Sequence, residues 1–581
     1  MSTQITLRSE AMVDPRGEFR RQPVRIAERP ASLQGRTVLL FDNTQLASQE
    51  AAYGPIFKWL SEYLQAEQGA RSSFDSRNLL RENREGTVSL AQTLAKSGID
   101  AVVVALCNAG ITQPTSLFAA ELERLGVPCV QMCTVLGYPL AGVTAAGYVP
   151  GLPIVQAELA TGAKDAFGKK ETLAIAPEIV AGLTSDRATL LARSQDLFPA
   201  GELPIASKGR MLLPPTTVPA SEAGGVLGVD VEPSDALLYD ELAKAELSDG
   251  LPVIDPTLKR VEAKLAFTDI GPDDMLVDEL PPSGSTITVR TLAANAVMAG
   301  CRPEYFPIIV AIFQAVSDPA YRLAQGAIST HPAANAVVVS GPLAEELGIQ
   351  SGGGCLGPGF RANATIGRAV NLTIMNVARA IPGKSDLGIF GSPAEYTYCF
   401  AESDKNNPWE PLHTDLYDPE TTSVTVHKCE APHNVNDPRL GPEELIKSIA
   451  ATAATLGGNN LGHPGHLLVM LNPGQARMLA KAGWSKQDVK SYLFETARNP
   501  QAEVLKRRGN GRFDGPQEFL AMTQVPVLRS PDDAIVVVAG DAGDAVGGFA
   551  MVGIPWGAAK AVSRPVALRD GSPLRTLKGR F

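Results

Sequence analysis

The chain has 581 residues, 44% hydrophobic and 20% charged, which is the usual balance of a globular protein of about three domains, or two with one large. Its net charge of −10 argues against nucleic acid as a partner, because a phosphate backbone requires a basic face. No apolar run is long enough to span a membrane and no secretory signal opens the chain, so we expect a cytoplasmic protein with seven reduced cysteines.

Four segments follow from the patterns along the chain. Residues 1–34 are polar and arginine-rich and predict a loose N-terminal arm. Residues 35–202 alternate apolar runs of strand length with amphipathic segments, which predicts a Rossmann-like α/β domain with a parallel sheet. A Pro/Gly-rich linker is expected over 203–249, and a larger C-terminal α/β domain, divisible into two subdomains, over 250–581.

Within the first domain we expect strands at 36–41, 99–106 and 127–133 and helices at 51–66, 88–97 and 113–125. In the second half, strands are expected at 335–340, 466–471 and 534–539. Helices are expected from about Asn363 to Ala380 and from a capped start at Ser485 and Asp488.

Cys107 is the leading candidate for chemistry, because it follows a buried strand and precedes a proline-started helix. Ligands of open α/β sheets bind at the carboxyl ends of the strands, and a helix N-terminus favours a thiolate. Asn108 could hold a substrate carbonyl or carboxylate. We therefore expect Cys107 at the end of a parallel strand and within reach of solvent. The alternative is a small buried apolar residue.

The segment also resembles known families. The strand end Asp42-Asn43, the run Asp100-Ala-Val-Val-Val before Cys107 and the stretch Gly151-Leu-Pro-Ile-Val155 are similar to the UGSC-like domain, named for a selenocysteine-Gly-Ser-Cys motif. Cys107 matches the chalcogen position, whereas the motif's second cysteine is absent from Leu106-Cys-Asn-Ala-Gly-Ile-Thr112. The Cys-Asn strand end also resembles the aspartate/glutamate racemase superfamily of cofactor-independent thiol enzymes, with Ala109 and Gly110 in place of Thr-Ala.

The second half resembles uncharacterised bacterial proteins encoded beside or fused to UGSC-like domains. The resemblance lies in Gly250-Leu-Pro-Val-Ile-Asp-Pro-Thr257, the run Asn295–Pro307, the run Gly357–Arg368, and Phe400-Ala-Glu with Pro408-Trp-Glu-Pro411. It implies no particular activity.

A second thiol, Cys301, lies in Ala299-Gly-Cys-Arg-Pro-Glu304, where Arg302 could stabilise a thiolate or bind a carboxylate. It could face Cys107 across a cleft between the halves, or it could be a buried structural cysteine. The glycine-rich loop 352–359 before Arg361 predicts an anion cradle, and we expect loop 351–363 to line that cleft. The residues assigned to substrate binding are Arg302, Ser351, Gly352, Gly353, Arg361, Asn363, Arg368 and Glu402.

Histidines supply the general acid/base candidates, His331 and His433, since imidazole titrates near neutral pH. The group His413, His427, Cys429 and His433 only suggests the spacing of a metal site, so we predict neither a metal nor another cofactor.

We expect a thiol-dependent lyase, hydrolase or isomerase, acting as a homo-oligomer on a small polar, anionic molecule. The catalytic set is Cys107, Asn108, Cys301, His331 and His433. The alternatives are a thiol/selenol-type oxidoreductase and a non-catalytic ligand-binding or assembly protein.

Overall fold

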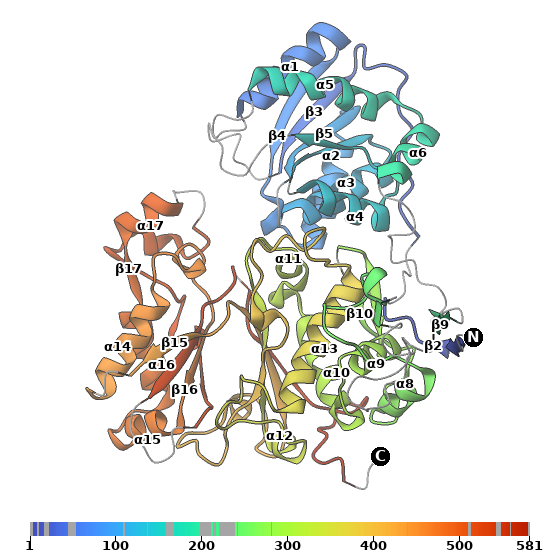
Figure 1. Ribbon diagram of the computed structural model, residues 1–581. Coiled ribbons are helices and arrows are strands. Elements are labelled where there is room, and N and C mark those ends of the chain that lie inside the picture. Colours follow the sequence, from blue (N-terminus) through green and yellow to red (C-terminus); the bar gives the residue numbers. More distant parts are fainter. Residues whose placement is uncertain are drawn as a thin grey trace.

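A computed structural model describes most of the chain. The described residues are 4–7, 11–16, 22–43, 54–107, 111–135, 137–157, 168–197, 211–212, 216–219, 239–240, 242–280, 282–437, 440–508, 513–541, 548–557 and 559–578. Figure 1 shows the N-terminal domain stacked on one end of a larger second half.

The N-terminal domain is built on a five-stranded, all-parallel sheet. Its strands are β3 (Thr37–Asp42), β4 (Arg71–Ser76), β5 (Ala101–Cys107), β6 (Cys129–Thr134) and β7 (Ile154–Ala157), in the order β4-β3-β5-β6-β7. Every residue of β5 and β6 is buried, as expected of central strands covered on both faces. This order is that of a doubly wound α/β fold, which confirms the predicted α/β class and the predicted parallel sheet.

Helices cover both faces of this sheet. On one face, α1 (Gly54–Gln68) and α5 (Lys169–Thr184) pack their apolar sides against the strands. On the other lie α2 (Arg84–Ala95), α3 (Thr112–Arg124) and α4 (Gly137–Tyr148), and α6 (Arg187–Leu197) joins the same core through Leu190. In Figure 1, α1 and α5 are drawn above the sheet and α3 and α4 below it.

The second half contains two four-stranded mixed sheets. One has the order β13-β12-β14-β21, with β12 (Ala334–Ser340), β13 (Cys399–Ala401), β14 (Ser423–Cys429) and β21 (Val562–Pro565). The other has the order β15-β20-β16-β19, with β15 (His433–Asn436), β16 (Leu467–Leu471), β19 (Ala534–Val538) and β20 (Phe549–Gly553). A shared apolar core that includes Val338, Phe400 and Met470 lies between them, so the two sheets pack face to face.

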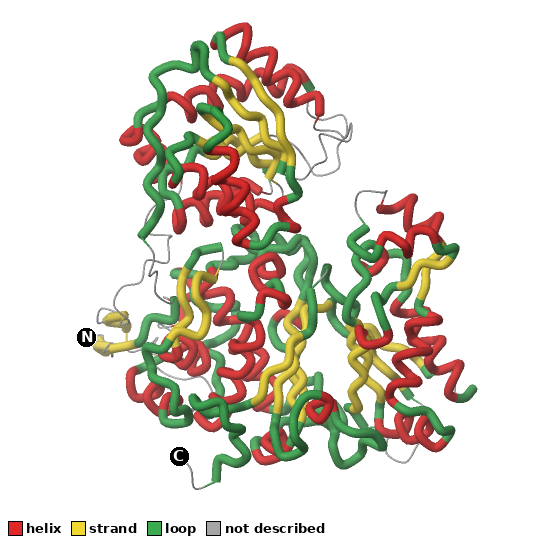
Figure 2. Tube along the Cα trace, turned by 180° about the vertical axis from the view of Figure 1, so that it is seen from behind, coloured by secondary structure: helices red, strands yellow, loops and turns green. Residues whose placement is uncertain are grey.

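Helices cover the outer faces of this pair. The helices α9 (Val289–Met298), α10 (Phe306–Val316) and α13 (Arg361–Ala378) cover the first sheet, and α14 (Pro442–Ala453), α15 (Pro473–Lys481) and α16 (Lys486–Thr496) cover the second. Figure 2 shows the two groups of strands side by side between flanking helices. The second half is therefore a four-layer α/β/β/α arrangement.

Smaller elements complete the second half. They are the helices α8 (Leu258–Leu265), α11 (Leu323–Ala327), α12 (Pro342–Glu346) and α17 (Gln501–Arg508), the hairpin of β10 (Met275–Leu280) with β11 (Ser285–Thr288), and the pair β17 (Arg498–Pro500) and β18 (Gln524–Pro526). Near the N-terminus, β1 (Gln4–Leu7) pairs with β9 (Thr216–Pro219), and β2 (Ala11–Met12) pairs with β8 (Met211–Leu212).

The described part of the segment 1–34 is not a loose arm. Ile26 and Leu33 are buried in the cores of the N-terminal domain, where Arg29 forms a fully buried ion pair of 2.6 Å with Glu123 of α3. Val13 belongs instead to the core of the second half, and its backbone N–H donates to Pro256 O. These apolar residues are spaced without helix or strand periodicity, so the sequence pattern does not predict their burial.

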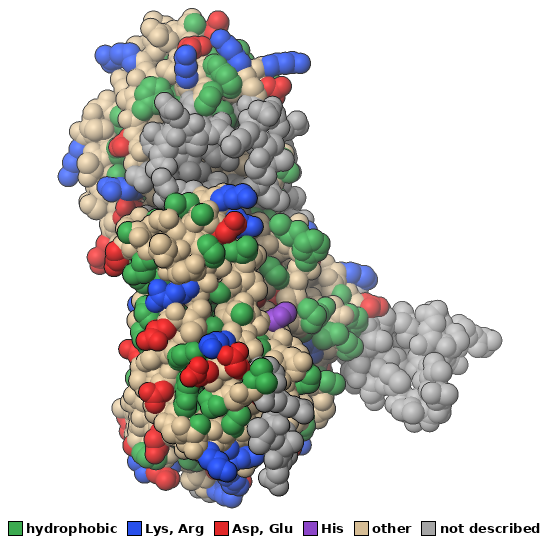
Figure 3. Space-filling model, turned by 90° about the vertical axis from the view of Figure 1, so that its left-hand side faces the viewer, with side chains coloured by type: hydrophobic (Ala, Val, Ile, Leu, Met, Phe, Trp, Pro, Cys, Tyr) green, Lys and Arg blue, Asp and Glu red, His purple; other side chains and the backbone are tan. Residues whose placement is uncertain are grey.

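Charges of both signs are interspersed on the face of the molecule shown in Figure 3, over both the N-terminal domain and the second half. Contact between the two halves includes an exposed ion pair of 3.5 Å between Arg84 of α2 and Glu279 of β10.

Candidate functional site

Cys107 is the last residue of β5, at the carboxyl edge of the parallel sheet. The neighbouring strand β3 ends at Asp42 and is followed by Asn43. The order of strands reverses between β3 and β5, which makes this the topological switch point of the sheet. The crevice at such a point is where doubly wound folds bind their ligands.

Two side-chain amides donate hydrogen bonds to the sulfur of Cys107. Gln131 Nε2, from β6, lies 3.1 Å from Sγ, and Asn43 Nδ2 lies 3.6 Å from it. Both amides are held in place, since Ser116 Oγ donates to Gln131 Oε1 and Asn43 Nδ2 also donates to Thr115 Oγ1. Because both groups are donors, they stabilise a negatively charged sulfur more than a neutral thiol.

A second thiol lies beside the first. Cys133 of β6 is the register partner of Cys107, and the two side chains share a hydrogen bond. Burial raises the pKa of Cys133 well above its ordinary value, and the neighbouring Cys107 raises it further. Cys133 is therefore a neutral thiol next to the amide-bound sulfur, in a pair that the spacing along the chain does not reveal.

Cys107 is fully buried, contrary to the expected solvent access. Helix α4, which was not predicted, packs Ala141 and Tyr138 against the two thiols. Its first residue, Gly137, approaches so closely that an added Cβ would lie 2.4 Å from the carbonyl oxygen of Cys107. The position of Cys107 at the end of a parallel strand is confirmed, whereas its sulfur lies under a helix. Asn108 lies outside the described residues.

Cys301 does not share a site with Cys107 in the described structure. It follows α9 in the core of the second half, and its Sγ donates a 3.1 Å hydrogen bond to Thr365 O. Burial raises its pKa to about 11, which keeps the thiol neutral. Arg302, next in the chain, forms an exposed, long ion pair of 3.7 Å with Glu304.

The glycine-rich loop lines a cavity of about 590 Å³ through residues 353–357. The other lining residues also belong to the second half, around the carboxyl ends of β16 and β19 and the start of β20, so the expected cleft shared between the halves is not formed by this loop. Its charged lining residue among those described is Asp541, which disfavours an anion. Within the loop, Gly352 O accepts from Cys355 N, and Ser351 O accepts from Gly540 N.

The polar residues after the loop hold the fold together. Arg361 donates from Nε and Nη2 to Gly300 O, and buried Asn363 joins Gln350 to Cys355 O. Neither side chain faces Cys107, because both contact loops that surround the start of α13. The contacts span up to 61 residues of sequence, which no local motif encodes.

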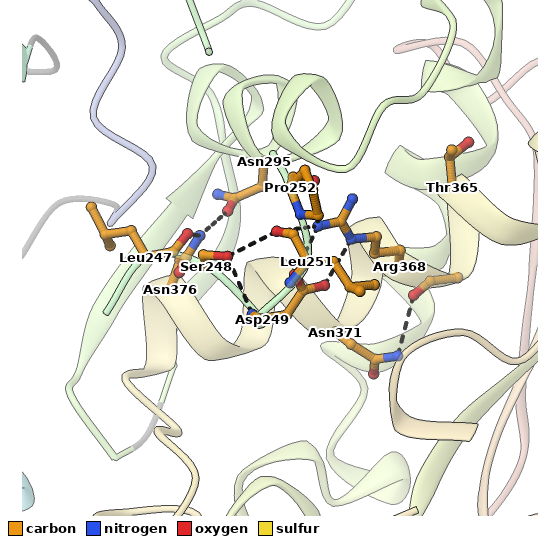
Figure 4. A network of polar contacts seen from close by, with 12 residues as sticks. Leu247, Ser248, Asp249, Leu251, Pro252, Asn295, Thr365, Arg368, Asn371 and Asn376 are labelled. Carbon is orange, nitrogen blue, oxygen red and sulfur yellow. Dashed lines mark hydrogen bonds and ion pairs between the residues drawn. The ribbon is translucent and has the colours of Figure 1, made fainter. Parts of the chain in front are cut away.

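Arg368 forms a two-pronged ion pair with Asp249, with both N···O distances at 2.7 Å, and also donates to the carbonyls of Leu251 and Pro252 (Figure 4). On the same helix, Asn376 donates to Asn295 Oδ1 and Leu247 O (Figure 4). These contacts fasten segment 247–252 onto α13. The guanidinium predicted to bind substrate is thus occupied by the protein itself.

Glu402 belongs to a buried polar network. Its carboxylate accepts from Ser340 Oγ at 2.6 Å and from the backbone N–H of Leu412, and Ser340 Oγ also lies 2.8 Å from His413 Nδ1. Burial raises the pKa of Glu402 to about 7. All three side chains are buried and none lines a described cavity, so the arrangement joins β12 to the loops around it.

The predicted acid/base histidines are apart from the thiols. His331 lies 3.7 Å from Glu430 and is partly exposed, and His433 is exposed on the edge strand β15. His413 is held by Ser340, while His427 and Cys429 are buried in β14. Across the described part of the chain, no three His, Cys, Asp or Glu side chains gather as metal ligands would.

A doubly wound parallel α/β domain with a pair of thiols at its switch point is thus the class that the fold and site define. Residues 11–185 match the UGSC family, so this N-terminal region is similar to that family. The match begins within the segment expected to be an arm, in agreement with the packing of Ile26 and Leu33.

Searches of curated proteins and of solved structures gave no match. Among the described helices, none has the length and apolar character needed to cross a bilayer.

Proposed function

We propose that the N-terminal domain is a thiol-dependent enzyme of lyase, hydrolase or isomerase type, with Cys107 as nucleophile or proton carrier for a small polar molecule. The observation that carries the proposal is the pair of amide donors, Gln131 and Asn43, directed at one sulfur at the switch point. Thiolates rather than thiols are the reactive form of cysteine, and donors to sulfur favour the thiolate.

Two further atoms support a polar substrate. Asn43 Oδ1 and Thr112 Oγ1 are buried and have no hydrogen-bond partner among the described residues. An unpaired buried polar atom is costly and calls for an explanation, which a substrate hydroxyl or amino group would provide. We do not place the arginines of the second half in this site, because Arg361 and Arg368 bind protein groups there.

The test is a screen of small polar compounds with the wild-type protein, followed by Cys107→Ser. A serine hydroxyl without its own base is a poor nucleophile, so turnover should be lost at an unchanged melting temperature. Cys129→Ser is the matched control, since Cys129 is equally buried on β6 but lies in an apolar cluster. Full activity of Cys107→Ser would remove the thiol from the mechanism.

A second candidate, a dithiol oxidoreductase, is favoured by Cys133. Cys107 and Cys133 would together give two electrons and two protons to a hydroperoxide, forming a disulfide, water and an alcohol. Treatment with a hydroperoxide should then produce one cross-linked peptide pair, lighter by two hydrogens. Turnover that survives in Cys133→Ser would favour the first candidate, and turnover that is lost there would favour the second.

A further inference from the structure

The second half contains a cavity of about 580 Å³ that no feature of the sequence suggested. It lies among α11, α13, β14 and the loop that follows α13. The side chain of Lys428, from β14, reaches this cavity, next to Asn335, its register partner on β12. A lysine near the end of a fully buried strand is unusual, because burial of an ammonium group costs free energy.

The surroundings hold this lysine in one position. Its Nζ donates to Asn335 Oδ1 at 3.1 Å, and Asn335 is itself fixed by Tyr321 and Asn371 through bonds of 2.6 Å each. Gly326 of α11 leaves room for the side chain, since an added Cβ would lie 2.5 Å from Lys428 Cε. The amine is thus positioned at the cavity by a buried amide network and a glycine.

Carboxyl groups share the cavity with the amine. Asp386 and Glu395 line it, each bound to a backbone N–H of its own loop, from Gly388 and Ser392 respectively. In the described structure neither forms an ion pair with Lys428. The other two lining carboxylates are neutralised by bases, Glu246 by Arg379 and Lys384, and Asp249 by Arg368.

Burial changes the protonation of these groups in a complementary way. It lowers the pKa of Lys428 to about 8, against the opposing effect of Asp386, Glu395 and Cys429. It also raises the pKa of Asp386 and of Glu395. Near neutral pH, an amine that is partly unprotonated therefore faces carboxyl groups that retain protons more readily than ordinary ones.

We propose that this cavity is a second reactive site, in which Lys428 forms an imine with a small uncharged aldehyde or ketone. The amine lone pair attacks the carbonyl carbon to give a carbinolamine. The carbinolamine hydroxyl takes a proton from the Asp386 or Glu395 carboxyl and leaves as water, so that a protonated imine and a carboxylate remain. No oxidant or cofactor is needed, and hydrolysis reverses the steps.

The lining selects the ligand class. Ile374 and Met375 form an apolar wall, and Phe390 stands at the rim with 95% of its surface exposed. The carboxyl groups disfavour an anion, because each one that ionises repels it. A neutral carbonyl compound with an apolar part satisfies both conditions.

The main test uses wild-type protein with propanal and sodium cyanoborohydride at pH 7, and peptide mass spectrometry compares lysines within the same molecules. Each unit of lowered pKa gives about tenfold more free amine, so Lys428 should be alkylated at least about tenfold faster than exposed Lys405. Equal or slower alkylation of Lys428 would overturn the proposal. Pyruvate tests the ligand class, since faster trapping of this anion than of propanal would contradict a neutral ligand.

Substitutions test the roles of the amine and of the proposed proton donors separately. Glu395→Gln and Asp386→Asn keep side-chain size and should together slow imine trapping about tenfold, while trinitrobenzenesulfonate, which reacts without loss of water, should label Lys428 at least as fast as before. Unchanged trapping would remove the carboxyl groups from the mechanism proposed. Lys428→Met should abolish the labelled peptide, and Cys107→Ser should leave it unchanged, so the two sites fail independently.

Discussion

Gln131 donates a 3.1 Å hydrogen bond from its side-chain amide to the sulfur of Cys107, across two adjacent parallel strands of one sheet. The contact joins a residue in the middle of β6 to the last residue of β5. It is held from behind by Ser116 of α3, whose hydroxyl donates to the other end of the amide. The surroundings of the sulfur at the end of β5 therefore depend on side chains from β6 and α3.

Gln131→Met should slow alkylation of Cys107. Methionine has a similar length but no donor, and a hydrogen bond to a charged group contributes about 1.5–3 kcal/mol, so the rate at pH 7.5 should fall at least about tenfold. Iodoacetamide labelling quantified by mass spectrometry measures it. Gln113→Met, on buried Gln113 of α3, is the control and should react at the wild-type rate. An unchanged rate in Gln131→Met would show that the amide does not activate the sulfur.

Arg29→Met should destabilise the N-terminal domain strongly. Glu123 would remain buried without its cation, although it would still accept from the N–H groups of Ala27 and Cys129, and loss of one partner of a buried pair costs about 3–5 kcal/mol. Arg36→Met removes an exposed partner of Asp100 and should cost about 0–1 kcal/mol. Urea unfolding compares the two. Equal effects would mean that residues 22–34 are not part of the domain core.

Arg368→Ala should lower stability rather than substrate affinity. The guanidinium fastens segment 247–252, and its loss leaves Asp249 largely buried and unpaired, at a cost of about 3 kcal/mol. Arg302→Ala, with its long exposed pair, should change stability by less than about 1 kcal/mol. Thermal unfolding measures both. A raised KM at an unchanged melting temperature in Arg368→Ala would restore its assignment to substrate binding.

Ionisation of buried Glu402 should make the second half less stable as pH rises. Its pKa is raised to about 7 in the folded protein by burial, above the value of about 4.3 of an unfolded chain. The folded state therefore binds the extra proton between these values. Stability decreases by about 3 kcal/mol from pH 4.3 to 7 through this group alone and levels off about one pH unit above 7. Glu402→Gln should remove that slope, as measured by urea unfolding at several pH values. A variant with the wild-type slope would exclude Glu402 as its source.

The sequence predicts elements well where one strand or helix carries its own pattern. The apolar run 99–106 and the cap at Ser485 correspond to β5 and to the start of α16, whose capping box with Asp488 is formed. Contacts between distant elements were not predictable. The group His413, His427, Cys429 and His433 suggested the spacing of a metal site, yet His427 and Cys429 are buried in β14, in a sheet that another sheet covers.

The candidate site was predictable only in part, because some of its residues meet through contacts between distant elements. Asp42-Asn43 and Cys107 are visible as strand ends, and parallel strands bring them to one edge. Gln131 and Cys133 lie within the next strand and gain their roles only from its register. Arg361 suggested an anion site because glycines precede it, but its partner is a carbonyl oxygen from another loop.

The placement of Val13 and of Ile26 in two different cores has a consequence for how the chain can be divided. The N-terminal segment completes the second half with residues 13–16 and then completes the first domain with residues 22–34. Cleavage between residues 203 and 235 would therefore not release two self-sufficient pieces. The N-terminal fragment would stay bound by its own leading residues, and the second half expressed from residue 250 would need those residues, supplied as a peptide, to refold fully.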